Sequence, residues 1–246
     1  MKNVLITGAS RGIGRAIALK MAEEECNLFL NASCKNGSKM LEAVRNEAER
    51  IHTEKKVGGK IFSVPCDVGD PEAVRKMFSD VGAGIDILIN NAGISYIGLV
   101  QDMSDEEWNR IVAVNLSSVH YCSRAVIPHM LAAGGGHILN ISSVWGNVGA
   151  SCETAYSAAK GGVNAYTKAL ARELAPSGIA VNAIACGCID TDMNSHFDKE
   201  EKEELCSQIP AGRFAEPEEV AELAAAICAQ STYLTGQIIT FDGGWT

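Results

Sequence analysis

Short apolar runs alternate with longer amphipathic segments along the whole chain. Runs such as V-L-I near the start and I-L-I further on are continuously apolar, which is typical of strands covered on both faces. The segments between them repeat apolar positions at helical spacing. The predicted strands span residues 3–7, 28–31, 60–64, 86–90, 137–142, 180–185 and 238–241. The predicted helices span residues 14–25, 38–53, 71–81, 105–132, 155–175 and 217–229.

This alternation predicts an α/β fold in three layers, a doubly wound parallel sheet with helices on both faces. We see neither a repeat nor a linker, so we expect residues 1–246 to form one domain. The longest irregular stretch, residues 186–212, contains the charged sequence D-K-E-E-K-E-E-L. We interpret it either as a solvated surface helix or as a substrate lid, because it follows the carboxyl end of a strand.

Charge and composition narrow the function classes. The 246 residues include 21 basic and 30 acidic ones, which gives a net charge of −9. Such a surface argues against nucleic-acid or anionic-membrane partners, and no apolar run reaches membrane-spanning length. The nine cysteines show no regular spacing, and the first residues enter a strand pattern at once. We therefore expect reduced thiols in a cytoplasmic protein without a signal peptide.

The sequence T-G-A-S-R-G-I-G joins the first predicted strand to the first predicted helix. Gly8, Gly12 and Gly14 permit a tight turn and a close approach of the backbone to a pyrophosphate at the helix N-terminus. Their GxxxGxG spacing differs from the commoner GxGxxG fingerprint. A glycine-rich turn can be only a turn, but its position at the head of an α/β alternation favours a dinucleotide site.

The residues after the second and third strands bear on which dinucleotide binds. The second strand is followed by N-A-S-C-K, without the carboxylate that would bind a ribose 2′-hydroxyl. Arg11 and Lys35 could instead neutralise a 2′-phosphate, which favours NADP(H); the alternative is that both are solvated loop cations. Asp67, followed by Val68, could accept a hydrogen bond from the adenine amino group.

A Tyr and a Lys stand four residues apart in Y-S-A-A-K, so Tyr156 and Lys160 share one helix face. An ammonium beside a phenol lowers the phenol pKa from about 10, which lets the Tyr exchange a proton with a substrate oxygen near neutral pH. Ser143, at the end of a predicted strand, could hydrogen-bond the same oxygen. Such a pair is common in helices without any function, and the glycine loop is what gives it weight.

The motifs T-G-A-S-R-G-I-G, N-N-A-G, S-S-V-W-G, Y-S-A-A-K and I-T-F-D-G-G occur in this order over essentially the whole chain. Together they resemble the short-chain dehydrogenase/reductase family. The resemblance implies a seven-stranded Rossmann sheet and NADPH-dependent reduction of a ketone to a secondary alcohol. It also implies a homotetramer, with residues 105–132 and 155–175 at one interface.

The resemblance implies a catalytic set of Asn115, Ser143, Tyr156 and Lys160. Tyr156 would be the acid/base, Ser143 would polarise the carbonyl, Lys160 would lower the Tyr156 pKa and hold the nicotinamide ribose, and Asn115 would anchor a water. Ser142 is expected to serve packing. The cofactor-binding residues, from the motifs and the resemblance together, would be Gly8, Ser10, Arg11, Gly12, Ile13, Gly14, Ser33, Lys35, Asp67, Val68, Asn91, Ala92, Gly93, Tyr156, Lys160, Gly187, Ile189 and Thr191.

The chain departs from the family pattern after the sixth strand, where Cys186, Gly187 and Cys188 replace the usual Pro-Gly. Cys186 is either a small apolar substitution or an oxidisable thiol. Two cysteines without further Cys or His partners make a weak metal site, so we expect no metal.

The closest broad resemblance is to the 3-oxoacyl-acyl-carrier-protein reductases, whose substrate rides on a very acidic protein. Their docking surface should be basic. Here the two corresponding stretches read A-A-G-G-G at 132–136 and A-P-S at 175–177, without cations. Another enzyme alternative is a small-alcohol or hydroxysteroid dehydrogenase. A non-catalytic dinucleotide-binding regulator is a further alternative, against which the intact catalytic set argues.

The stretch W-G-N-V-G-A-S-C-E also resembles the elongation factor P 5-aminopentanone reductases, which reduce a ketone on a modified lysine of that factor. That ketone lies near an amine, which is cationic at neutral pH. Glu153 is either a charge that suits a helix start or the partner of this amine. Trp145 and Cys152 would line the same substrate pocket or pack the loop.

Overall fold

Seven parallel strands form one sheet in the computed structural model, which describes residues 1–33, 37–82, 84–195 and 197–246. The strand order is β3-β2-β1-β4-β5-β6-β7. The strands are β1 (Lys2–Ile6), β2 (Cys26–Leu30), β3 (Ile61–Ser63), β4 (Ile87–Asn90), β5 (Gly136–Ser143), β6 (Ile179–Cys186) and β7 (Ile238–Phe241).

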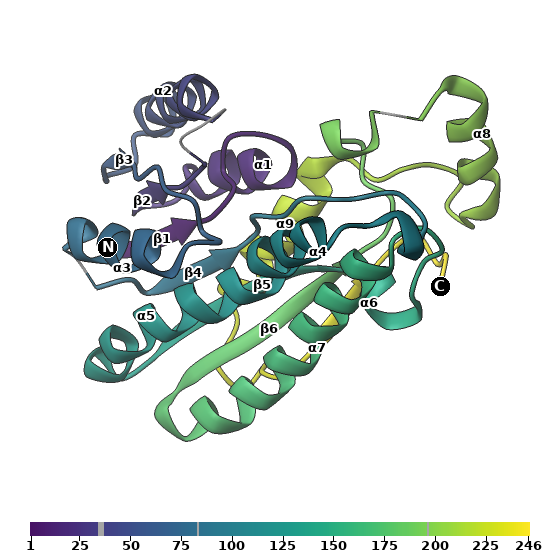
Figure 1. The fold of residues 1–246 in the computed structure, drawn as a ribbon. Helices are drawn as coiled ribbons and strands as arrows, with labels where there is room; N and C mark the ends of the chain where they lie inside the picture. The colour runs from purple at the N-terminus through teal and green to yellow at the C-terminus, as the bar shows by residue number, and fades with distance from the viewer. Residues whose placement is uncertain (34–36, 83, 196) are drawn as a thin grey trace.

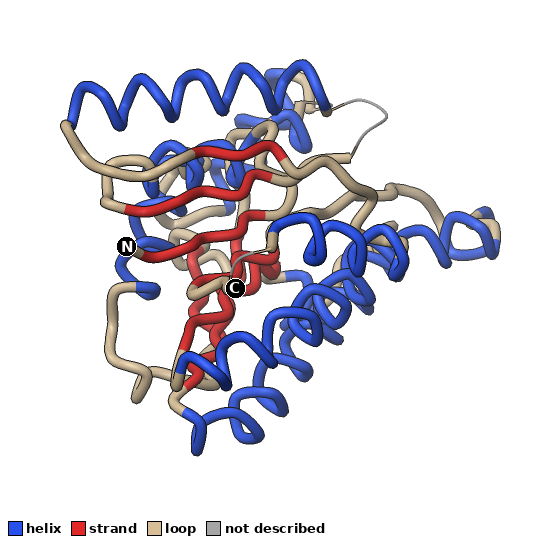
Figure 2. Tube along the Cα trace, turned by 90° about the vertical axis from the view of Figure 1, so that its left-hand side faces the viewer, coloured by secondary structure: helices blue, strands red, loops and turns tan. Residues whose placement is uncertain are grey.

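Helices cover both faces of this twisted sheet (Figure 2). One face packs against α1 (Gly12–Met21), α2 (Ser38–Lys55) and α9 (Pro217–Cys228). The other packs against α3 (Pro71–Val81), α5 (Ser118–Ala133) and α7 (Thr154–Leu174). The prediction of a three-layer, doubly wound α/β fold is therefore confirmed.

Alternate residues of the central strands enter the two cores. In β1, Val4 and Ile6 pack on the α1 side while Leu5 packs on the α5 side. In β4, Ile89 packs on the α1 side and Leu88 packs on the α5 side. Because both faces are buried, most positions are apolar, which explains the continuous apolar runs in the sequence.

The order of the strands reverses between β1 and β4, which are neighbours in the sheet. In open α/β sheets a ligand crevice forms at such a switch point, outside the carboxyl ends of the strands. The short helix α6 (Trp145–Val148), the helix α8 (Lys199–Gln208) and the chain's C-terminus lie at this same end (Figure 1). The 3₁₀ turns are η1 (Val100–Asp102), η3 (Ala175–Ser177) and η4 (Asp192–Asn194).

The helix predicted over 105–132 contains a change of geometry that the sequence did not reveal. It runs as α4 (Asp105–Val112), then a π-helical turn at Ala113–Ser117, then α5. The side-chain amide of Asn115 donates to the oxygen of Ile111 at 3.1 Å. It thereby binds the carbonyl that a regular α-helix would offer to the backbone N–H of residue 115, which favours the wider turn.

Other boundaries moved by a few residues. The first helix, predicted over 14–25, is Gly12–Met21, because the chain turns at residues 22–25 to enter β2. The stretch 186–212 holds η4 and α8, and α8 has no fully buried residue. Within the described ranges, no helix is long and apolar enough to cross a membrane.

Candidate active site

The predicted site residues converge on one cavity of about 520 Å³ at the carboxyl edge of the sheet. Every predicted cofactor residue that the structure describes lines this cavity, as do Ser143, Tyr156 and Lys160. Lys35 lies outside the described residues. The grouping brings together loops that follow β1, β2, β3, β4, β5 and β6.

The glycine loop is shaped by two close approaches. Gly8 has φ +66°, and a Cβ there would lie 2.8 Å from the Cα of Ala92. A Cβ on Gly14 would lie 2.2 Å from the oxygen of Gly8. The side-chain amide of Asn91 donates to the oxygens of Thr7 and Gly8, at 3.0 and 3.1 Å, and so holds the loop. Any larger residue at positions 8 or 14 would open this turn.

The N-terminus of α1 faces the same cavity. Its N-cap residue, Arg11, makes no side-chain hydrogen bond to the first helical turn. The backbone N–H groups of that turn and the positive end of the helix dipole are suited to an anion. The residues present therefore fit a dinucleotide pyrophosphate.

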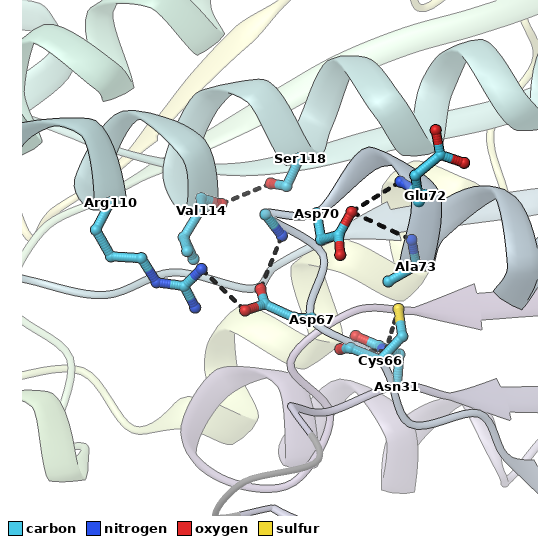
Figure 3. Close-up of polar contacts among 10 residues, drawn as sticks. Asn31, Cys66, Asp67, Asp70, Glu72, Ala73, Arg110, Val114 and Ser118 are labelled. Atoms are coloured by element: carbon cyan, nitrogen blue, oxygen red, sulfur yellow. Dashed lines mark hydrogen bonds and ion pairs between the residues drawn. The ribbon is translucent and has the colours of Figure 1, made fainter. Parts of the chain in front are cut away.

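The far end of the cavity lies beside the residues that follow β2 and β3. Arg11 and Ser33 line it, and the guanidinium of Arg11 is 3.9 Å from the carboxylate of Asp192. Asp67 is held by two contacts, a hydrogen bond from Gly69 N at 2.9 Å and an ion pair with Arg110 at 2.9 Å (Figure 3). This end fits the adenosine half of a dinucleotide.

The three reacting side chains meet where β5 ends and α7 passes. Ser143 is the last residue of β5, and its hydroxyl oxygen accepts a hydrogen bond from Trp145 N at 3.2 Å. The ammonium of Lys160 is only 4% exposed and donates to the oxygen of Ile141 at 2.7 Å. It lies 5.6 Å from the centre of the Tyr156 ring.

The electrostatics of the pair differ from the prediction that Lys160 lowers the Tyr156 pKa. Burial raises the pKa of Tyr156, and the nearby Cys186 and Glu153 raise it further, while a hydrogen bond with Ser143 acts in the opposite direction. Burial also lowers the pKa of Lys160 to about 8. In this structure desolvation outweighs the attraction between an ammonium and a phenolate.

Asn115 is fully buried and does not line the cavity. Its amide nitrogen donates to the oxygen of Ile94 at 2.9 Å, and its carbonyl oxygen accepts from Ile94 N at 3.2 Å. These two bonds fix the loop that follows β4. A Cβ on Gly93 would lie 2.8 Å from the Asn115 oxygen and 3.8 Å from Lys160 Nζ, so the three residues are close. The water-anchoring role stays a prediction.

The three predicted substrate residues do not line this cavity. Trp145 packs against Trp245, with ring centres 4.9 Å apart. Cys152 has φ +62°, and its oxygen accepts from Gly98 N at 2.9 Å. Glu153 is the N-cap residue of α7 but its side chain does not cap the helix, and its charge raises the pKa of Tyr156.

The thiols that replace the family's Pro-Gly are held in their protonated form. Burial raises the pKa of Cys186 to about 12 and that of Cys188 to about 11. A protonated, buried thiol reacts slowly, which favours the interpretation of Cys186 as a small apolar substitution. Among the described residues, no three His, Cys, Asp or Glu side chains are grouped to hold a metal.

Several cavity residues were missed by sequence reasoning. They are Asn31, Ala32, Ile94, Ser95, Arg110, Val114, Ile141, Ser142, Asp192, Met193 and Asn194. Arg110 and Val114 carried a usable signal, because they stand four residues apart on a predicted helix just before Asn115. Ser142, expected to serve packing, also donates a hydrogen bond to Asn164.

A switch-point crevice with a glycine loop and a Ser, Tyr and Lys set defines a Rossmann-type oxidoreductase. A family profile described as enoyl-(acyl carrier protein) reductase matches residues 8–246. The chain belongs to the short-chain dehydrogenase/reductase family and is an oxidoreductase acting on CH–OH and C=O groups. The predicted resemblance is confirmed.

Relatives match over nearly their whole length. The 3-oxoacyl-[acyl-carrier-protein] reductase FabG of Staphylococcus aureus is 40% identical over 248 residues, which cover 99% of this chain and 97% of the relative. The uncharacterized oxidoreductase YmfI of Bacillus subtilis is 38% identical over 245 residues, 99% of this chain and 98% of the relative. The crystal structure of a 3-oxoacyl-[acyl-carrier protein] reductase from Brucella melitensis has a TM-score of 0.91 at 34% identity, covering 100% of this chain and 91% of that one.

A further solved structure was determined with a cofactor. It is a putative gluconate 5-dehydrogenase from Beutenbergia cavernae with bound NADP, which has a TM-score of 0.91 at 32% identity. The match covers 99% of this chain and 96% of that chain.

Proposed function

We propose that the protein reduces a ketone to a secondary alcohol with NADPH. The observation that carries the proposal is the single cavity that holds the glycine loop at one end and Ser143, Tyr156 and Lys160 at the other. A cofactor bound to that loop would bring its nicotinamide beside the hydroxyls of Ser143 and Tyr156. A chain that only sensed dinucleotides would not require this set.

NADP(H) is favoured over NAD(H) by the residues that follow β2. Asn31, Ala32 and Ser33 line the cavity there, and none of them carries the carboxylate that would repel a 2′-phosphate. Arg11 lines the same cavity and supplies a positive charge, with its guanidinium 3.9 Å from the carboxylate of Asp192. The NADP bound to the related gluconate 5-dehydrogenase agrees with this choice.

The chemistry follows from where protons can be held. A bound nicotinamide supplies the hydride. Ser143, whose oxygen accepts from Trp145 N, hydrogen-bonds Tyr156 and can turn its proton toward a bound substrate oxygen. Tyr156 donates a proton to that oxygen as negative charge develops there. Lys160, held by the oxygen of Ile141 beside the Tyr156 ring, supplies a positive charge that offsets part of the cost of forming a tyrosinate there.

The test is NADPH oxidation, followed by absorbance, with two kinds of substrate. One is an acetoacetyl thioester, free and on acyl carrier protein, which the FabG relatives favour by name. The other is elongation factor P that carries the aminopentanone group. Turnover of the thioester would assign the chain to acyl chemistry. No NADPH oxidation with any ketone would contradict the proposal.

The position of Glu153 favours the second candidate, a ketone next to an amine on elongation factor P. Its carboxylate acts on the pKa of Tyr156, so it lies near the place where the substrate oxygen must bind. A carboxylate there would attract the ammonium of such a substrate and repel the phosphates of an acyl carrier. Turnover of the modified factor alone would select this candidate.

The proposal has three further parts, which are a substrate lid, a single domain and a homotetramer. Residues 186–212, which follow β6 and include α8, would act as the substrate lid of a single domain. The helical segments over residues 105–132 and 155–175 would form one interface of a homotetramer. Light scattering on the purified protein would measure the assembly directly, and a monomeric mass would contradict the tetramer.

A further inference from the structure

Arg110 stands at the adenosine end of the cavity, opposite the residues that follow β2 and β3. It belongs to α4 and lines the cavity together with Asp67 and Val68. Its side chain crosses from α4 toward the loop after β3 (Figure 3). None of the sequence motifs includes it.

The guanidinium is held in place by a built set of contacts. Its Nη1 lies 2.9 Å from Oδ2 of Asp67, and Oδ1 of Asp67 accepts from Gly69 N at 2.9 Å. A Cβ on Gly69 would lie 3.0 Å from Arg110 Nη1 and 3.3 Å from Val114 Cγ2. The absence of a side chain at position 69 therefore leaves the space that Arg110 occupies.

Two properties of the group suit an adenine. A guanidinium is planar and stacks on π-faces, which an ammonium does not do. Val114, four residues further along the same helix, adds an apolar surface to the same wall of the cavity. Asp67 is thereby left at the edge of the base, where a carboxylate can accept more than one hydrogen bond.

Charge supports the same assignment. Asp67 places a carboxylate in a cavity that takes a polyanionic cofactor, and Arg110 offsets that charge. Half of each side chain is exposed, with 48% for Arg110 and 40% for Asp67. Such a pair adds little to the stability of the fold, so a variant should remain folded.

We propose that Arg110 is a cofactor-binding residue of this chain. Its guanidinium stacks on the adenine of the dinucleotide, while Asp67 holds the guanidinium in place. The proposal rests on the proposed function, because it needs a bound dinucleotide. It assigns Arg110 to the base and leaves the 2′-phosphate to Arg11 and Ser33.

The experiment measures dissociation constants of NADPH and NADH by fluorescence titration for the wild type and four variants. In Arg110→Gln, we expect both constants to rise by the same factor, about 5- to 30-fold, because both cofactors carry the same adenine. Arg110→Lys should recover only part of the loss, because Lys keeps the charge but not the plane. Arg75→Gln, which removes an exposed, ion-paired arginine of α3 outside the cavity, is the matched control and should change neither constant.

Other outcomes would overturn the proposal in distinguishable ways. A loss for NADPH alone would assign Arg110 to the 2′-phosphate. An unchanged affinity would remove it from the site. Full recovery of affinity in the double variant Asp67→Asn, Arg110→Gln would show that Arg110 only neutralises Asp67. If the wild type bound neither cofactor, the proposed function itself would fail, and the variants would not be needed to show it.

Discussion

The hydroxyl of Ser142 donates a hydrogen bond of 2.6 Å to the side-chain oxygen of Asn164. The amide of Asn164 in turn donates to the side chain of Asn147 at 2.8 Å. This chain of contacts joins β5, α7 and α6 directly behind Ser143 and Lys160. Asn164 is 6% exposed, so its polar atoms depend on these partners.

Replacing Asn164 by Leu should therefore disturb both stability and catalysis. We expect a loss of about 1–3 kcal/mol in the free energy of unfolding, because the buried Ser142 hydroxyl loses its 2.6 Å acceptor and keeps only the oxygen of Lys160 at 3.4 Å. We expect kcat to fall about tenfold or more through misplacement of Ser143, with little change in the Kd for NADPH. Urea unfolding and steady-state kinetics measure the two effects. Asn147→Ala, at the exposed end of this series of hydrogen bonds, is the control. An unchanged kcat in Asn164→Leu would contradict the positioning role.

Tyr156→Phe removes the proposed proton donor and little else. Turnover should fall by about 100-fold or more, since a positioned acid contributes on that scale. The Kd for NADPH should stay within about twofold, because the ring remains. Tyr166→Phe, on the same helix but with its hydroxyl near His120, should keep full activity. Turnover by Tyr156→Phe close to the wild-type rate would show that another group supplies the proton.

The buried Lys160 predicts a particular dependence of stability on pH. Burial lowers its pKa from 10.5 to about 8, so between these values the unfolded chain holds a proton that the folded chain has lost. Unfolding then takes up a proton, and stability rises with pH across this window as the cost of the buried charge disappears. Between pH 8 and pH 10.5, the free energy of unfolding of the wild type should rise by up to roughly 3 kcal/mol relative to that of Lys160→Met. Chemical unfolding of both proteins at several pH values measures this difference. Taking the difference cancels the contributions of the other titrating groups. A difference that does not change with pH would contradict a buried Lys160 that loses its proton near pH 8.

Much of this architecture could be predicted from the sequence because it follows from local rules. Continuous apolar strands and their alternation with helices predicted the sheet, and the glycine loop predicted the cavity that Gly8 and Gly14 shape. Features that depend on contacts between distant segments could not be predicted. The π-helical turn arises from the hydrogen bonds of Asn115 to Ile94 and Ile111. Arg110 forms an ion pair with Asp67, which lies 43 positions earlier in the sequence.

In the structure the Tyr156 pKa is raised, whereas the spacing suggested a lowered pKa, and the reason is related. The spacing of Tyr156 and Lys160 places them on one helix face, but it does not say how deeply they are buried or where the ammonium points. In the structure the ammonium is bound to the oxygen of Ile141, and desolvation controls both side chains. Burial is a property of the packed fold, so the spacing alone could not supply it.

Glu153→Gln separates the two candidate substrates. If Glu153 binds an ammonium, KM for an aminoketone should rise about tenfold, whereas KM for a neutral ketone of the same length should stay constant. The kcat for the neutral ketone is the internal control, because the charge of Glu153 also acts on Tyr156. Equal changes for both ketones would mean that Glu153 tunes Tyr156 and does not read the substrate.

The side chain of Lys202 connects α8 to the wall of the cavity. Its ammonium lies 2.9 Å from both carboxylate oxygens of Asp190 and 5.2 Å from the centre of the Phe214 ring, and Asp190 directly precedes the cavity residue Thr191. Because α8 has no fully buried residue, Lys202→Met should loosen the helix and raise KM for the ketone several-fold, while an exposed ion pair changes the free energy of unfolding by less than about 1 kcal/mol. Lys199→Met, on the same helix but with its ammonium 3.7 Å from the carboxylate of Glu203 within that helix, is the matched control. High salt should raise the wild-type KM toward that of Lys202→Met, because it screens the pair. Identical KM values for the Lys202 and Lys199 variants would show that α8 does not act as a lid through this contact.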